Sequence, residues 1–380
     1  MIAIAADLVL PHVDIECYLL RLLEPISGRP MNIFRLCALV CVIPVAVSVT
    51  GTAADQVTRR SDRVTFRGEF TAMTPSLVTI RQQNGQTQDI PVSDVLVIRF
   101  DMEPPALSQA QSSERSGALD VALQKYRQIQ SEYSGEDSRL VADLKFLIAR
   151  TQVRIAFANP AEVAGAAKAI RDFRTENKSN FRVLEATLLE AELLSLDPEK
   201  TEEARALLGE VQKSDVKGYR LQAGVQLGLL LLTGRDTAGG LTAFEGVLQE
   251  SAGDAGASAA FYDASLGKAM CQKADGRSDE AIATLNDIIS KASESETRTL
   301  ARAWVLKGDC LREKGLPKDA LLAYLHVDVL YSSEPSSHAE ALFHLGSLWG
   351  PAGHQNRADD ARVQLASRYP NSSWAKKSAN

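Results

Sequence analysis

The sequence predicts a mainly α-helical fold, built of stacked antiparallel helical hairpins that follow a small β unit. Three observations lead to this prediction. From residue 106 onward apolar residues recur with a helical period, and small residues recur within that pattern at intervals of about 40 residues. Over 62–101 the apolar period is two instead. The composition is 45% hydrophobic but only 6% aromatic, which suits helices packed through small side chains better than a large β-sandwich.

The first element along the chain is a predicted signal peptide over 31–54. A short basic stretch precedes the uncharged apolar run 36–49, and small residues follow up to Ala54, which is the order of regions in a secretory signal. The run is shorter than the roughly 20 residues of a membrane span, so a cleaved signal is favoured over an uncleaved membrane anchor and over a buried helix. The sequence therefore predicts an exported protein, periplasmic or envelope-associated, whose mature chain begins near Asp55.

Residues 1–30 do not fit this signal, because the first region of a signal is basic and this segment carries several acids. We interpret Met31 as the true start and 1–30 as a mis-called extension. A cytoplasmic segment ahead of a membrane anchor is the alternative. The acids are Asp7, Asp14, Glu16 and Glu24.

Cleavage would leave two of the five cysteines, Cys271 and Cys310. Two cysteines in a chain of this length are no disulfide framework. Two small buried thiols are therefore favoured over a single bridge between neighbouring hairpins.

The segment 62–101 predicts a small β unit. Thr74-Pro75 and Asn84-Gly85 are turn signals, and the second is typical of a hairpin. The alternating residues predict five short strands: Val64 with Phe66; Phe70; Val78 with Ile80; Ile90 with Val92; and Val95 to Phe100. The unit weakly resembles SH3- or Sm-like barrels. It carries four arginines against five acids, so a structural or protein-contacting cap is favoured over RNA binding.

After Pro104-Pro105 the pattern is helical. Gly228, Gly267, Gly308 and Gly346 sit inside apolar helical patterns. Beyond each lies a second helix with a small residue and, one turn later, a larger apolar residue, because two helices approach closely only where a small residue faces the partner. These pairs are Gly240 with Phe244, Ala281 with Leu285, Ala320 with Tyr324, and Ala361 with Leu365.

At these residues the chain resembles the tetratricopeptide repeat (TPR) family, of the exported bacterial type. The best unit runs from Trp304 and Gly308 through Ala320 and Tyr324 to Pro335. The resemblance covers 217–372, and degenerate hairpins fill 106–216, where Ala122 with Tyr126 and Ala204 with Leu208 keep the rhythm. It implies a right-handed α-solenoid whose concave groove is lined by the first helix of each hairpin.

The resemblance also implies which residues face that groove, namely those just before and after each glycine. Their mixture of apolar and charged types fits a partly apolar extended peptide or a partner helix. The alternative is that they only cover the inner wall. The asparagine-plus-lysine clamp that some members use on a peptide carboxylate is not present as a set. The groove residues are Val225, Leu229, Phe261, Lys268, Cys271, Arg302, Val305, Asp309, Arg312, Glu340, Phe343 and Ser347.

The sequence lacks the common motifs of catalysis. The chain has no Walker motif, no dinucleotide fingerprint and no Gly-x-Ser-x-Gly elbow. Glu340 and His344 lie one helical turn apart but not in a His-Glu-x-x-His pattern, so a solvated pair is expected rather than a metal site. The acids of 199–203 and Asp359-Asp360 are expected to stabilise the starts of second helices. The expectation is a non-enzyme with no cofactor and no metal.

The sequence thus favours a protein-interaction scaffold of the bacterial cell envelope that binds a protein or peptide partner. Membrane contact is expected only if 31–54 remains as an anchor. A nucleic-acid or ribonucleoprotein module built on the Sm-like segment is the alternative, but the net charge of −6 argues against a partner chosen for its phosphates.

Overall fold

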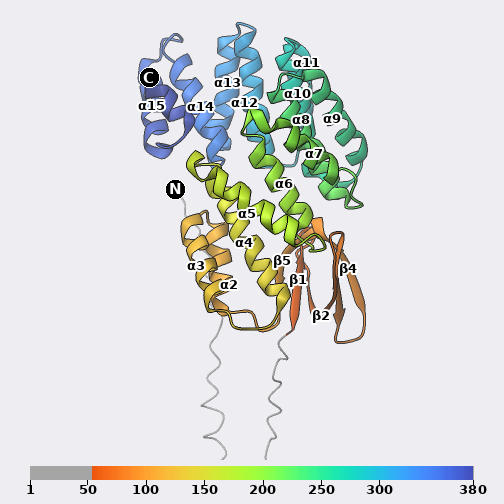
Figure 1. The fold of residues 1–380 in the computed structure, drawn as a ribbon. Helices are drawn as coiled ribbons and strands as arrows, with labels where there is room; N and C mark the ends of the chain where they lie inside the picture. The colour runs from red at the N-terminus through yellow and green to blue at the C-terminus, as the bar shows by residue number, and fades with distance from the viewer. Residues whose placement is uncertain (1–53, 380) are drawn as a thin grey trace, which may run out of the picture. The chain divides into compact units, whose positions relative to one another are not determined.

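The computed structural model describes residues 54–379 (Figure 1). The segment 1–30 and nearly all of the predicted signal 31–54 lie outside these residues. Within the described part of the chain, no helix has both the length and the apolar character needed to span a bilayer.

The β unit is a five-stranded antiparallel sheet with the order β4-β3-β2-β1-β5. The prediction of a small β unit is confirmed, but its strands differ from those expected. The expected strands around Phe66 and Phe70 are one strand, β2, whose pairing with β3 shifts register between Phe70 and Ala72. The remaining strand is β1, which precedes the predicted boundary at 62. The strands are β1 (Asp55–Arg59), β2 (Thr65–Met73), β3 (Leu77–Gln82), β4 (Thr87–Pro91) and β5 (Val95–Arg99), with a 3-10 turn, η3 (Val92–Asp94), before β5.

Helical hairpins make up the rest, and each helix packs against the next, as the sequence predicted. First helices carry even numbers and second helices odd ones. The pairs are α2 (Pro105–Arg115) with α3 (Leu119–Glu132), α4 (Ser138–Ala156) with α5 (Val163–Glu176), α6 (Val183–Leu194) with α7 (Thr201–Val211), α8 (Lys217–Thr233) with α9 (Thr237–Ser251), α10 (Ser258–Ala274) with α11 (Ser278–Lys291), α12 (Thr297–Glu313) with α13 (Pro317–Leu330), and α14 (Pro335–Leu348) with α15 (Gln355–Arg368); α16 (Ser373–Ala379) follows.

The prediction that acids lie at the starts of second helices is confirmed for α7 and wrong for α15. Glu202 and Glu203 lie in the first turn of α7. Asp359 and Asp360 lie beyond the first turn of α15, because that helix begins at Gln355. Asp359 instead pairs with Arg362, at 2.9 Å.

Small residues allow the helices to approach closely. The ring of Phe244 on α9 lies between Gly228 on α8 and Gly267 on α10: a Cβ atom at either glycine would come within 2.6 Å or 2.3 Å of ring carbons. The ring of Tyr324 on α13 lies against Gly308 on α12 in the same way: a Cβ atom at Gly308 would come within 2.6 Å of a ring carbon. These contacts confirm the geometric reason for the small-and-large pairs in the sequence.

The β unit and the helices α2 to α8 share one hydrophobic core, which runs from Val57 in β1 to Leu230 in α8. The carboxylate of Asp55 accepts hydrogen bonds from the amides of Phe70 and Asp101 and pairs with Arg139 on α4, at 2.9 Å. The Arg139 guanidinium also lies over the Phe100 ring. The sheet is therefore fastened to the start of α4 as well as joined through the chain.

Candidate partner-binding face

The predicted groove residues lie on α8, α10, α12 and α14, and each of these first helices contacts the next. We call this set of side chains the first-helix face. The most exposed members are Leu229, which is 39% exposed, Arg312 and Ser347. Val225, Phe261, Lys268, Arg302 and Phe343 are half-buried.

Two predicted groove residues, Val305 and Cys271, are wrong, because they are fully buried. Val305 is 0% exposed and lies in the core shared by α12, α13 and α14. Cys271 is equally buried. Phe343 precedes Gly346 by three residues, as Val305 precedes Gly308. Its ring packs beside the Trp374 ring of α16, with the ring centroids 5.1 Å apart. The position three residues before the glycine therefore faces the next helix of the stack rather than a partner.

The cysteine prediction is confirmed: Cys271 and Cys310 are both free and buried. Burial raises the pKa of each thiol to about 11, so neither is a reactive thiolate near neutral pH.

The structure brings three predicted residues together between α12 and α14. Arg302 donates to Glu340 at 2.7 Å, and Asp309 lies 3.6 Å from Nε2 of His344. The Tyr324 hydroxyl on α13 donates to Asp309 at 2.7 Å. We call these five residues the α12–α14 cluster. Lys268 on α10, in contrast, pairs with Glu245 on α9. Val225 and Leu229 are on α8, and α10 lies between α8 and α12 in the order of first helices.

Burial sets the charge states in the α12–α14 cluster. Asp309, Glu340 and His344 are only 9%, 8% and 8% exposed, so the expected solvated pair of Glu340 and His344 is wrong. Burial lowers the pKa of His344 to about 4. Burial also raises the pKa of Glu340, although Arg302 opposes the shift. The imidazole of His344 stacks on the Tyr324 ring, with centroids 4.7 Å apart.

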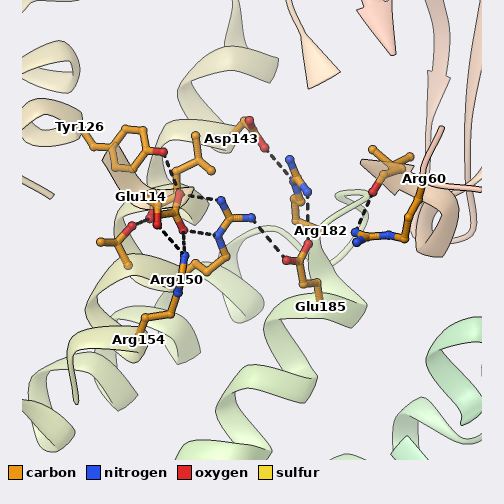
Figure 2. Close-up of polar contacts among 11 residues, drawn as sticks. Arg60, Glu114, Tyr126, Asp143, Arg150, Arg154, Arg182 and Glu185 are labelled. Atoms are coloured by element: carbon orange, nitrogen blue, oxygen red, sulfur yellow. Dashed lines mark hydrogen bonds and ion pairs between the residues drawn. The ribbon is translucent and has the colours of Figure 1, made fainter. Parts of the chain in front are cut away.

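Sequence reasoning missed a second polar cluster, which we call the α2–α6 cluster (Figure 2). Glu114 on α2 accepts bonds from the Tyr126 hydroxyl at 2.8 Å and from Arg150 and Arg154 on α4. Arg150 also pairs with Glu185 on α6, at 3.5 Å. The cluster contains three acids and three arginines: Glu114, Asp143, Glu185, Arg150, Arg154 and Arg182.

A signal for this cluster exists in the sequence. Glu114 continues the apolar stripe of Leu107 and Ala110 on α2, where an acid is out of place unless a partner neutralises it. The arginines that do so are far along the chain, so the pairing itself could not be read from local pattern.

A pocket of about 460 Å³ lies where α14, α15 and α16 meet. None of the predicted groove residues lines it. Its walls are Pro335, Ser336, Ala339, Arg368, Tyr369, Pro370, Asn371, Ser372, Ser373 and Trp374.

Comparisons with known proteins address the fold. A family model described as a tetratricopeptide repeat matches residues 263–295, which fall in α10 and α11 and the loop after them. A search of curated proteins finds no match. Among solved structures, a tetratricopeptide repeat protein from Parabacteroides merdae is 16% identical, with 72% of this chain and 98% of that chain covered and a TM-score of 0.50.

Two further structures align less well. A Rap protein complexed with Competence and Sporulation Factor is 12% identical, with 72% of this chain and 77% of that chain covered and a TM-score of 0.47. PilW, a type IV pilus biogenesis factor, is 17% identical, with 63% and 99% covered and a TM-score of 0.44. Residues 263–295 match the tetratricopeptide repeat model, and the hairpins around them have the fold of a tetratricopeptide repeat protein.

Proposed function

We propose that this protein is a non-catalytic scaffold that binds a peptide or a helix of a partner protein on its first-helix face. The observation that supports this most is the continuity of the face across hairpins. Arg302 and Glu340 bridge α12 to α14, and Lys273 and Glu313 bridge α10 to α12. An elongated ligand laid across successive first helices would meet a different side chain at each step.

The chemistry of the face suggests the character of the ligand. Leu229 and Phe261 offer apolar contact, while exposed Arg312 offers positive charge. Exposed arginines and partly exposed aromatic rings are residue types that often carry binding energy at protein interfaces. The ligand we propose is therefore a partly apolar segment with acidic residues.

We also propose that the protein acts outside the cytoplasm, periplasmic or attached to the cell envelope. The support is the order of basic, apolar and small residues over 31–54. The described fold then begins close behind this segment, since Asp55 is the first residue of β1.

Co-purification from the envelope fraction tests the binding face. The tagged mature protein is used to capture partners, and the variant Leu229→Ala with Arg312→Ala is compared with it. Both side chains are exposed, so this variant should keep its thermal midpoint and lose at least about tenfold in partner binding, about 1.4 kcal/mol.

The matched control is Leu322→Ala with Lys318→Ala, two exposed residues on the second helix α13. It should bind like the native protein. Equal loss in both double variants, or no loss in the first, would show that the first-helix face is not the binding site. Capture that nuclease treatment abolishes would support the nucleic-acid alternative instead.

A further inference from the structure

We propose that Asp309, Glu340 and His344 form a binding site for one divalent metal ion of the zinc type, between α12 and α14. One ligand atom from each residue lies within 4.8 Å of the other two, and all three residues are buried. One imidazole nitrogen with two carboxylate oxygens is a ligand set that Zn²⁺ accepts in proteins. This site does not depend on the proposed function, because metal binding can be measured on the protein alone.

The separation of the His344 and Asp309 ligand atoms suits a small ion. Two ligands about 2.1 Å from a tetrahedral Zn²⁺ are about 3.4 Å apart. Nε2 of His344 lies 3.6 Å from Oδ1 of Asp309, which is too long for a good hydrogen bond but close to that separation. The nearby His338 takes no part, since its two ring nitrogens already contact Tyr369 and Asp328.

The α2–α6 and α12–α14 clusters differ in charge, and the difference points to a cation. Glu114 in the α2–α6 cluster is bonded by a second-helix tyrosine and by arginines of the next first helix. Asp309 is bonded by the second-helix Tyr324 in the same way, but the residue facing it from the next first helix is His344. An ion held there would supply the positive charge that arginines supply beside Glu114.

Other cations near the α12–α14 cluster are already engaged or exposed. Among the lysines and arginines that the structure describes, Arg302 alone forms an ion pair with one of the two acids, and its partner is Glu340. Lys273 pairs with Glu313, and Lys377 lies over the Trp374 ring. Arg312 is exposed, and its side chain bonds to the Tyr324 hydroxyl.

Neighbouring groups hold the three ligands in place. The Tyr324 hydroxyl bonds to Asp309, Arg302 bonds to Glu340, and the His344 ring stacks on Tyr324. Such outer contacts orient the ligands of metal sites and are part of their affinity. Three protein ligands leave a fourth position for water or for a side chain of a bound partner.

Titration of the purified protein with Co²⁺ tests the site, after a chelator has removed bound metal. The expected result is one equivalent of Co²⁺ per chain, seen as visible absorption bands that one equivalent of Zn²⁺ abolishes. His344→Phe keeps a ring on Tyr324 but has no nitrogen, and it should weaken Co²⁺ binding on the order of 100-fold. Glu340→Gln keeps the shape of the side chain and should also weaken it.

The matched control is His354→Gln, which removes an exposed imidazole in the loop after α14. It should leave the titration unchanged. The proposal fails if the native protein shows no saturable equivalent, or if folded His344→Phe binds like the native protein. If circular dichroism shows that His344→Phe is unfolded, the folded Glu340→Gln variant decides, and unchanged Co²⁺ binding there overturns the site.

Discussion

At the scale of single residues, the crossings of the helices depend on the absence of a side chain. A residue with a Cβ atom at Gly308 would overlap the Tyr324 ring, and Tyr324 cannot turn away freely because its hydroxyl is bonded to buried Asp309. Glycine has the opposite effect where nothing lies near it, since it lowers helix stability without helping the packing. Gly246, exposed on α9, is such a position.

These two glycines give a paired prediction. Gly308→Val should lower the free energy of unfolding by about 1–3 kcal/mol, because it overpacks the contact between α12 and α13. Gly246→Ala should raise it by roughly 0.5–1 kcal/mol, because alanine is the better helix former. Urea unfolding followed by circular dichroism measures both. Equal effects at the two positions would contradict the close approach at Gly308.

At the scale of elements, the α2–α6 cluster joins three successive first helices through buried charge. Glu114 is only 2% exposed and is bonded from α3 and α4. Burial raises the pKa of its carboxyl, but Arg150, Tyr126 and Arg154 outweigh burial and lower it. A folded-state pKa below the unfolded value stabilises the fold above that value, and the stabilisation is lost as pH falls through the folded pKa.

Glu114→Gln should therefore cost about 1–3 kcal/mol of unfolding free energy at neutral pH, because it leaves half-buried Arg150 and exposed Arg154 without their counter-charge. The control is Glu203→Gln on α7, whose acid also pairs with an arginine of a neighbouring helix, Arg171, but is 47% exposed. It should cost less than about 1 kcal/mol. Chemical unfolding at neutral and acid pH checks both, and the cost of Glu114→Gln should shrink in acid. A cost that stays the same in acid would show that the charge of Glu114 is not the cause.

At the scale of the whole molecule, the described part of the chain has several separate hydrophobic cores, one after another along the sequence. The β unit shares its hydrophobic core with α2 to α8, whereas the C-terminal hairpins are built around separate clusters. Such arrays are stabilised mainly between neighbours. The start of the mature chain matters for the first of these cores, because Asp55 at the head of β1 is bonded to Arg139.

We predict that the native mature protein begins near Asp55 and is recovered outside the cytoplasm. The reason is the signal-like order of 31–54, and cleavage after Ala54 would spare every strand of the sheet. Mass spectrometry of the N-terminal peptide from cell fractions measures this. An intact peptide spanning Met31 to Ala54 in the cytosol would contradict the predicted export.

The sequence by itself determined the hairpins. Close approach of two helices requires a small residue where they cross. This requirement appears in the sequence as a small residue followed one turn later by a large one, as in Ala320 and Tyr324 on α13. The same local pattern predicted a small β unit, but it divided β2 in two, because Gly68 puts no apolar side chain between Phe66 and Phe70.

Tertiary structure alone decided which polar residues meet. Glu114 and Arg150 are joined across two hairpins, and Asp309 faces His344 only because α12 and α14 stack side by side. The same stacking buries Val305, which the family resemblance placed on the same face as exposed Arg312. A single helix's pattern shows which residues share a face, whereas exposure of that face depends on the neighbour packed against it.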